Sequence, residues 1–358
     1  MQCLIIESLF VLSWRVSEMP AININAFAVV IALVFGNAVV IAQSPTPAKR
    51  PSEKIEPASS KAAEQPTPAL RKVERKELTA TASPNGGEEY VLKYKFDPGL
   101  IIRSEVIHLA KTDTKIDTTG QNSNSRTVSQ KSWKVIENKN GEMTFEYRID
   151  EIDMSQRIGV ENEIRYSSKT QDEPARQFQT AADSVGKLIS TVTIDEQGMI
   201  LARSDDTNPP NLGMGDITLP VPATPVNIGA TWEIPRELRI YRDDRTLKTV
   251  RFRELFRLDK VSAGVATITV RSEMLTSISE PKEEAQVLQQ LSNGVIRFDI
   301  DAGRMISKEL AWDKTVVGFS GDGSVMDYSA RLDEQVVEAE MVNTATKTAI
   351  KANSTESR

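Results

Sequence analysis

Two residue types that carry much of protein chemistry are almost missing from this chain. Its 358 residues include one cysteine, Cys3, and one histidine, His108. Because Cys3 lies in a stretch that we expect to be removed on export, the mature chain would have no thiol for a disulfide, a metal site or a nucleophile. A catalytic zinc site usually takes two or three histidines, and a serine–histidine mechanism would have to use His108. This scarcity argues against zinc, thiol and serine chemistry.

Motifs of nucleotide-binding and hydrolytic enzymes are missing as well. No glycine-rich phosphate loop occurs in an alternating βαβ context. The nearest match to the G-x-S-x-G elbow of serine hydrolases, at 318–322, has Asp322 in place of the second glycine. Acidic pairs such as Asp205 with Asp206 and Asp243 with Asp244 keep a carboxylate-based hydrolase open as an alternative. We therefore predict a protein that is not an enzyme and uses no cofactor.

The N-terminal residues are typical of an export signal. An apolar run over 26–42 is interrupted only by Gly36 and Asn37 and ends in small residues. Signal peptidase accepts this arrangement, so we predict a signal peptide at 1–42, with Met19 as an alternative true start. The competing interpretation is an uncleaved N-terminal membrane anchor, for which the run is at the lower limit of length. We expect an exported protein, periplasmic or secreted.

Residues 43–87 differ in composition from the rest, being rich in Pro, Ala, Ser, Lys and Glu and poor in large apolar side chains. Such a segment cannot bury enough surface to offset its chain entropy, so we predict a disordered linker. The polar residues 341–358 predict a disordered tail. The formal net charge of the chain is −6, which gives no sign of a nucleic-acid partner.

The chain between these segments is typical of many short strands. Residues 90–96 alternate apolar and polar side chains as a half-buried strand does, and a long hairpin with a polar tip at 111–127 follows. Asn140 and Gly141 predict a tight turn, because both residues accept positive φ. We assign 88–208 to a first β-rich half.

A second β-rich half, 209–340, repeats features of the first. The turn sequence I-D-E-Q-G-M-I at 194–200 returns as I-D-A-G-R-M-I at 300–306. An apolar stripe with helical spacing begins at Pro174 and again at Pro281, where proline suits the first turn of a helix.

We expect the first of these helices to run to Ile189, with Asp172 as its cap, and the second to end at Asn293 and Gly294. Each helix has one apolar face and so needs one sheet face to cover it. The predicted fold class is mainly β (α+β): an antiparallel sheet built from two similar halves, each covered by one amphipathic helix.

Two motifs in the second half suggest binding chemistry, and each also has a simpler explanation. Residues 299–303 begin like a D-x-D-x-G calcium loop, but their glycine is fifth where an EF-hand loop has it sixth, and an Asp-capped hairpin explains them. Arg251, Arg253 and Arg257 share one face of a strand, either as an anion-binding ladder or as a solvated face beside acidic neighbours. We therefore assign no catalytic, metal-binding or ligand-binding residue.

The stretch from Leu219 and Pro220 to Trp232, with Pro225, Val226 and Gly229 between, and the two I-D-x-x-x-M-I turns resemble a family of secreted bacterial β-rich proteins of unknown function, over about residues 88–335. At the level of fold alone, a curved antiparallel sheet covered by helices is similar to the periplasmic lipoprotein carriers, and that resemblance implies a concave face that holds acyl chains.

Our leading functional hypothesis is an exported, non-enzymatic β-rich binding or envelope-associated module of unknown ligand. The alternative is a periplasmic carrier that holds a lipid or another apolar ligand between sheet and helices. In either case the expected partner is a lipid or an envelope component.

Overall fold

The computed structural model describes residues 71–72, 78–84, 86–170, 173–204 and 218–341, and this part of the chain is mainly β. The predicted signal peptide (1–42), Asp172, Asp205 and Asp206 lie outside the described residues. The first eight strands are β1 (Arg71–Lys72), β2 (Glu89–Tyr90), β3 (Leu100–Ile116), β4 (Thr119–Lys139), β5 (Glu142–Ile158), β6 (Ile164–Ser167), β7 (Leu188–Ile194) and β8 (Ile200–Ser204). The others are β9 (Val226–Asn227), β10 (Thr231–Tyr241), β11 (Leu247–Ser262), β12 (Val265–Met274), β13 (Asn293–Asp299), β14 (Arg304–Val317) and β15 (Ser324–Met341).

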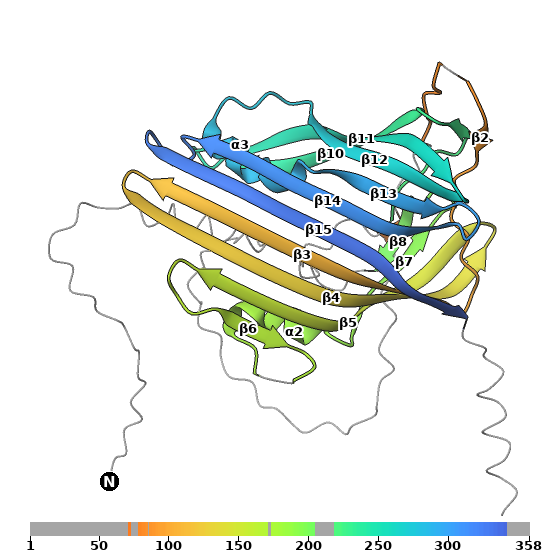
Figure 1. The fold of residues 1–358 in the computed structure, drawn as a ribbon, viewed down its shortest axis with the longest axis horizontal. Coiled ribbons are helices and arrows are strands. Elements are labelled where there is room, and N and C mark those ends of the chain that lie inside the picture. The colour runs from red at the N-terminus through yellow and green to blue at the C-terminus, as the bar shows by residue number, and fades with distance from the viewer. Residues whose placement is uncertain (1–70, 73–77, 85, 171–172, 205–217, 342–358) are drawn as a thin grey trace, which may run out of the picture.

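The described strands other than β2 and β9 form one 13-stranded sheet with the order β1-β8-β7-β5-β4-β3-β15-β14-β13-β12-β11-β10, and β6 pairs with β5. Neighbouring strands are antiparallel throughout. The last strand, β15, lies between β14 and β3, so it joins the second half of the chain to the first (Figure 1). The predicted antiparallel sheet is confirmed, and it is continuous across both halves.

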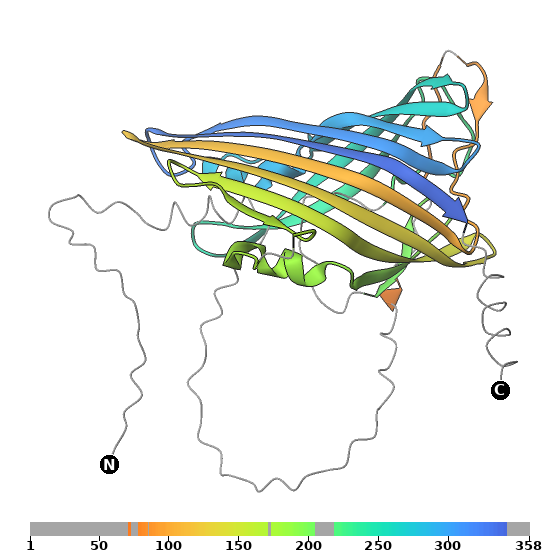
Figure 2. The same ribbon diagram turned by 60° about the horizontal axis from the view of Figure 1, so that its bottom comes forward.

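The sheet is strongly curved, and its concave inner face carries the core (Figure 2). The stretch before residue 88 contributes to both edges of the sheet, as the edge strand β1 at one side and through a bridge to β10 at the other. Arg71 and Lys72 pair with β8, and Thr81 forms a bridge with Thr231 at the start of β10. The predicted linker 43–87 is therefore not a free tether at these positions, because backbone hydrogen bonds offset the entropy that its composition cannot.

Residues 91–98 cross the inner face instead of joining the sheet. The alternation over 90–96 correctly predicts that Leu92, Tyr94 and Phe96 are buried, but β2 pairs only with β9. The Tyr94 N–H donates to the carbonyl oxygen of Glu196 at 2.8 Å, and the Lys95 N–H donates to that of Gly303 at 3.0 Å. The segment that we expected to be a half-buried strand therefore pairs with no strand of the sheet. Its backbone N–H groups are instead hydrogen-bonded to the turns on either side.

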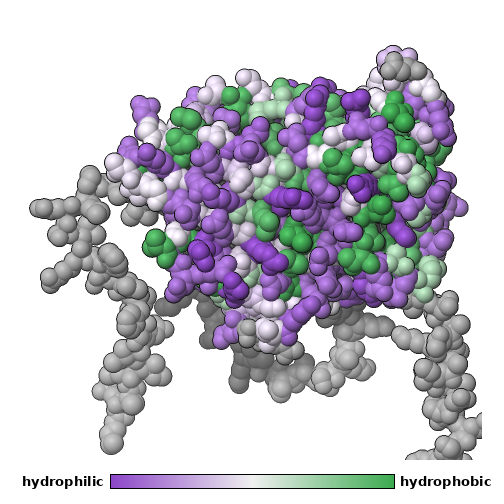
Figure 3. All heavy atoms as spheres, viewed as in Figure 1, coloured by the Kyte–Doolittle hydropathy of each residue, from purple (hydrophilic) through white to green (hydrophobic). Residues whose placement is uncertain are grey.

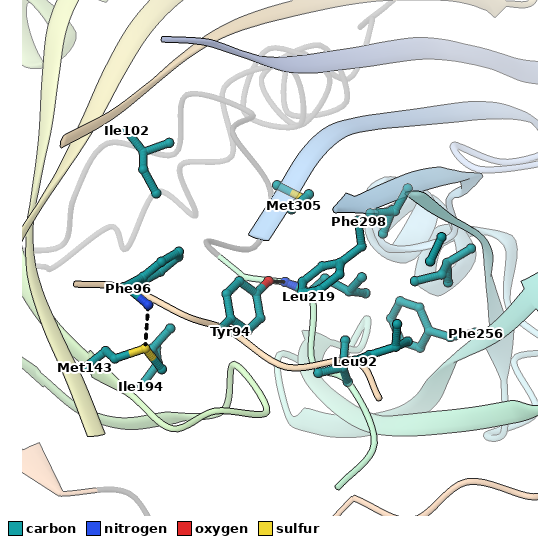
Figure 4. Close-up of a cluster of buried hydrophobic side chains, with 14 of the residues drawn as sticks. Leu92, Tyr94, Phe96, Ile102, Met143, Ile194, Leu219, Phe256, Phe298 and Met305 are labelled. Carbon is teal, nitrogen blue, oxygen red and sulfur yellow. Dashed lines mark hydrogen bonds between the residues drawn. The ribbon is translucent and has the colours of Figure 1, made fainter. Parts of the chain in front are cut away.

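One continuous apolar cluster, which we call the base core, surrounds this crossing segment. It includes Leu92, Tyr94, Phe96, Met143, Phe145, Trp232, Phe256, Phe298 and Met305. The Tyr94 hydroxyl accepts a hydrogen bond from the Leu219 N–H at 2.9 Å, and its ring packs edge-on against Phe298 (Figure 4). The base core lies at the end of the sheet where the hairpins β4–β5, β7–β8 and β13–β14 turn.

The two I-D-x-x-x-M-I turns both lie against the crossing segment. Gly198 and Gly303 have positive φ values of +74° and +61°. A Cβ atom on Gly198 would lie 2.4 Å from the ring of Tyr94, and one on Gly303 would lie 2.7 Å from the backbone nitrogen of Lys95. Glycine is therefore required here both by the backbone conformation and by the close approach.

The helices are shorter than the sequence predicts. The first consists of the 3₁₀ turn η1 (Arg176–Phe178) and α2 (Gln179–Ser184), and the expected continuation to Ile189 is wrong because that residue belongs to β7. Val185 is already extended and Gly186 has a φ of +73°, so the backbone leaves the helix there. No helix in the part of the chain that the structure describes is long and apolar enough to cross a membrane.

The second helical segment is α3 (Pro281–Val287), followed by the 3₁₀ turn η2 (Leu288–Gln290). The predicted cap at Asn293 and Gly294 is wrong, because these residues begin β13. Gly294 is needed in the strand, since a Cβ there would lie 2.0 Å from the carbonyl oxygen of Glu309. Helix α2 packs against β5, and α3 packs against β10 and β14. Strand β12 comes directly before α3, whereas the short strand β6, antiparallel to β5, lies between β5 and α2. Strands β5 and β12 themselves run in the same direction, away from hairpin turns at the base core.

Candidate functional site

The outer face of the sheet holds the arginines singled out in the sequence. Figure 3 shows a mixture of hydrophilic and hydrophobic side chains on the convex face that it views. Arg251 and Arg257 are exposed, and the guanidinium of Arg253 lies 2.7 Å from the carboxylates of Glu233 and Glu273 on the neighbouring strands. The hydrogen bond from Arg253, together with the nearby charge of Arg271, holds the pKa of the Glu273 carboxyl below its usual value. The arrangement is that of a solvated, charge-paired face.

The calcium-like turn at 299–303 uses its first carboxylate for the backbone. Asp299 Oδ1 accepts a hydrogen bond from the Ala302 N–H at 2.8 Å. In the related turn, Asp195 Oδ1 accepts from the N–H groups of Gln197 and Met199 at 3.0 and 2.9 Å. Over the described ranges no group of three His, Cys, Asp or Glu side chains is placed to hold a metal ion.

His108 lies on the inner face of β3 and packs edge-on against Trp312 on β14, with ring centroids 6.3 Å apart. Burial lowers the pKa of the imidazole, so the neutral form predominates at neutral pH. In the 318–322 turn, the Ser320 N–H donates to the Ser324 hydroxyl oxygen at 2.9 Å. A structural role is sufficient to explain the contacts of both His108 and Ser320.

The most unusual feature of the inner face is a cluster of three buried charges: Lys131 on β4, Lys308 on β14 and Glu334 on β15. The Lys131 ammonium lies 2.6 Å from Glu334 Oε1, and the Lys308 ammonium lies 3.0 Å from Glu334 Oε2. The exposed fractions of these side chains are 2%, 6% and 1% in the order Lys131, Lys308, Glu334. We call these three residues the ionic cluster.

The register of the sheet explains how Lys131 reaches Glu334. The two residues are separated by β3, on which Ser104 is opposite Lys131 and Val106 is opposite Glu334. A lysine side chain is long enough to extend across the intervening strand, whereas Lys308 is directly opposite Glu334. Three segments far apart in sequence therefore meet at one point of the inner face.

The electrostatics of the ionic cluster are unbalanced. Burial lowers the pKa of the Lys131 ammonium, although the nearby Glu334 carboxylate opposes this shift. Burial also penalises the charged form of Glu334, but the two lysines outweigh it and lower the pKa of this carboxyl. With all three groups charged, two positive charges face one negative charge, so the cluster carries a net charge of about +1 away from water.

Sequence reasoning missed the ionic cluster, although a signal was present. Lys131 is two positions from Ser129 and from Trp133, Lys308 is two positions from Leu310, and Glu334 is two positions from Leu332. Each charged residue thus occupies a position where the period of two predicts an inward side chain. A charge at such a position is uncommon and indicates a buried partner.

A row of small hydroxyl residues leads from the ionic cluster toward the helices. It consists of Ser123, Ser125, Thr127 and Ser129, successive inward positions on β4, and we call it the hydroxyl strip. Several buried donors on or beside it have no hydrogen-bond partner among the described residues: the hydroxyls of Ser123 and Ser129, Trp133 Nε1 and Gln156 Nε2. Buried polar groups are nearly always paired, so these donors indicate that something else meets them.

Apolar side chains flank the hydroxyl strip on both sides. On the β5 side, Ile149, Ile152, Met154, Tyr166, Phe178 and Ala181 pack around α2. On the β3 side, Ala110, Ala285, Leu288, Val316, Phe319, Met326, Tyr328 and Ala330 pack around α3. The hydroxyl strip therefore runs between two apolar clusters, which we call the apolar walls.

No protein-family model matches this chain, and no curated protein does either.

Proposed function

We propose that this protein is an exported binding protein whose ligand lies against the inner sheet face, between the regions that α2 and α3 cover. The observation that carries the proposal is the set of buried donors without partners along the hydroxyl strip. Each such group left empty would cost about 1–3 kcal/mol, so a ligand or ordered water that accepts their hydrogen bonds would stabilise the protein. Support for export comes from the apolar run over 26–42.

The ionic cluster supports binding rather than catalysis. A general acid or base works best when its pKa is near the working pH. Lys131 and Lys308 hold the pKa of Glu334 below its ordinary value, so this carboxylate is a weak base and stays ionised. A group arranged in this way holds charge in place and is poorly suited to proton transfer.

A second candidate function is transport of a lipid or another apolar ligand between sheet and helices. The apolar walls beside the hydroxyl strip favour it, because an acyl chain lying on the strip would contact both walls. The resemblance to periplasmic lipoprotein carriers points the same way at the level of fold.

We also infer that the two halves derive from one repeated unit. In sheet order, β3-β4-β5, α2, β7-β8 corresponds to β10-β11-β12, α3, β13-β14. Each unit starts with the same turn: the Leu100 N–H donates to Asp97 at 3.1 Å, and the Ala230 N–H donates to Asn227 at 3.0 Å. A duplicated origin would explain why both I-D-x-x-x-M-I turns meet the crossing segment.

Ligand occupancy can be tested on the full chain isolated from its native envelope. We expect native mass spectrometry to find a bound lipid-sized molecule. Ser125→Leu places a larger side chain on the hydroxyl strip, and we expect it to reduce the bound fraction at least fivefold. Asn124→Leu is the matched control, because the neighbouring residue on β4 faces outward and is exposed. A chain that carries and takes up no lipid would contradict the carrier, and hydrolysis of a common ester or glycoside that Glu334→Gln abolishes would contradict a non-enzymatic role.

A further inference from the structure

We propose that the ligand carries one carboxylate and that this group binds beside Lys131, at the end of the hydroxyl strip. The ligand is thus a long-chain fatty acid or a close chemical relative. This inference rests on the proposed function, since it names the head group of a molecule held on the inner face.

The first argument is charge. Two ammonium groups and one carboxylate are buried together, each with an exposed fraction of 6% or less. An uncompensated charge in a protein interior is strongly unfavourable. With all three groups charged, one further carboxylate would bring the count to two positive and two negative charges. It would also favour the charged form of Lys131, which burial disfavours, whereas a neutral head group or ordered water would do neither.

The second argument is hydrogen bonding. Ser129, Lys131 and Trp133 are consecutive inward residues of β4, spaced by about 7 Å along the strand. The Ser129 hydroxyl and Trp133 Nε1 have no partner among the described residues, and Ser129 has an exposed fraction of only 1%. The Lys131 ammonium also lies 5.9 Å from the centre of the Trp133 ring. Hydrogen-bond donors therefore gather on both sides of Lys131, and a carboxylate is an acceptor with about four lone-pair sites.

The third argument is the direction in which the chain of the ligand would run. Toward Trp133 lies the base core, where Trp133 stacks on Phe145 with ring centroids 4.8 Å apart. Toward Ser123 the inward side chains are short over roughly 26 Å of strand, counted from Lys131. A head group at Lys131 therefore places the chain along the hydroxyl strip, between the apolar walls.

The test compares two ligands that differ only in the head group. The delipidated full chain is titrated with hexadecanoic acid and with hexadecanol, and binding is followed by calorimetry at constant pH and salt. We expect the acid to bind at least tenfold more tightly than the alcohol. Lys131→Met should remove most of this difference by weakening the acid alone, and Lys308→Met should do the same to a smaller extent.

The variants are chosen so that the fold survives. Removing Lys131 leaves Glu334 paired one-to-one with Lys308, and thermal unfolding of the variant checks that the structure persists. Lys134→Met is the matched control, because Lys134 lies on the same strand but is exposed. It should leave both affinities unchanged.

The possible failures can be told apart. If neither ligand binds, the proposed apolar-ligand function is wrong and this inference falls with it. If acid and alcohol bind equally, and Lys131→Met weakens neither, the function stands while the carboxylate proposal is overturned. The unpaired donors would then be met by ordered water.

Discussion

The two ends of the inner sheet face are built differently. At the base, one continuous apolar core surrounds the crossing segment 91–98, and the backbone of that segment is hydrogen-bonded to the turns on either side. At the helix-covered end, the apolar residues divide into three smaller clusters, around α2, around α3, and around Ile240, Val250 and Val287. The ionic cluster lies between the two ends.

This difference implies different roles for the two ends of the sheet, one in stability and the other in ligand binding. A large continuous core stabilises the sheet in proportion to the apolar area that it removes from water. Small clusters separated by a polar row stabilise it less, and they open at a lower free energy than the main core. We therefore expect the base to set global stability and the helix-covered end to determine what the protein binds.

The largest contrast should come from truncating one core side chain at each end. Phe298 in the base is 0% exposed, and Leu288 at the helix-covered end is 2% exposed. We expect Phe298→Ala to lower the free energy of unfolding by about 4 kcal/mol and Leu288→Ala by about 2 kcal/mol. Urea unfolding measures both values, with the outward Val295→Ala as a control. Equal losses of unfolding free energy in the two variants would show that the two ends contribute equally to stability.

The ionic cluster should give the next largest effect. Glu334→Gln leaves two buried ammonium groups facing each other without a counter-charge, and we expect a loss of about 3 kcal/mol or more. Replacing all three residues together, Lys131→Met, Lys308→Met and Glu334→Leu, should restore stability to near that of the wild type. A triple variant less stable than Glu334→Gln would show that the charges themselves hold the two ends together.

The same carboxylate makes stability depend on pH in one direction. Because the folded pKa of Glu334 is lowered from its ordinary value of 4.5, its contribution is present above pH 4.5. That contribution is lost as pH falls from 4.5 through the folded pKa, since the unfolded chain then binds more protons. Thermal unfolding between pH 3 and pH 6 should therefore show a steeper loss in the wild type than in Glu334→Gln.

The smallest effect should distinguish a paired hydroxyl from an unpaired one. The Ser204 hydroxyl oxygen accepts from the Thr191 N–H at 3.1 Å, so Ser204→Ala should cost about 1 kcal/mol. Ser129→Ala removes a buried hydroxyl that has no partner among the described residues, so in the ligand-free protein the variant should be at least as stable as the wild type. Chemical denaturation of the two variants in parallel provides the measurement. A loss of 1 kcal/mol or more for Ser129→Ala would mean that water already satisfies the strip.

Local patterns allowed much of the sheet to be predicted. Asn140 and Gly141 turn with positive φ, as do Ala263 and Gly264, because these dipeptides link neighbouring strands without help from the rest of the molecule. The predicted hairpin around 111–127 is present as β3 and β4, and one face of its polar limbs carries the hydroxyl strip.

The helices and the candidate site were harder to predict. The apolar stripe after Pro174 continues at helical spacing to Ile189, yet β7 pairs with β5 over those last residues, and pairing in the sheet outweighs local propensity. The ionic cluster could not be assembled from the sequence either. Alternation places each of its members inward but does not say which strands are neighbours.

By itself, the sequence of this protein indicated its mainly β class, hairpin turns such as that at Asn140 and Gly141, and the alternation of buried and exposed side chains along strands. These properties depend on residues a few positions apart, so local periodicity and backbone sterics are sufficient to specify them. Only the tertiary structure decided that β15 pairs with β3, that residues 91–98 cross the inner face, and that Lys131, Lys308 and Glu334 meet. Those contacts join segments far apart in the chain, and they exist only because the curved sheet closes over one shared core.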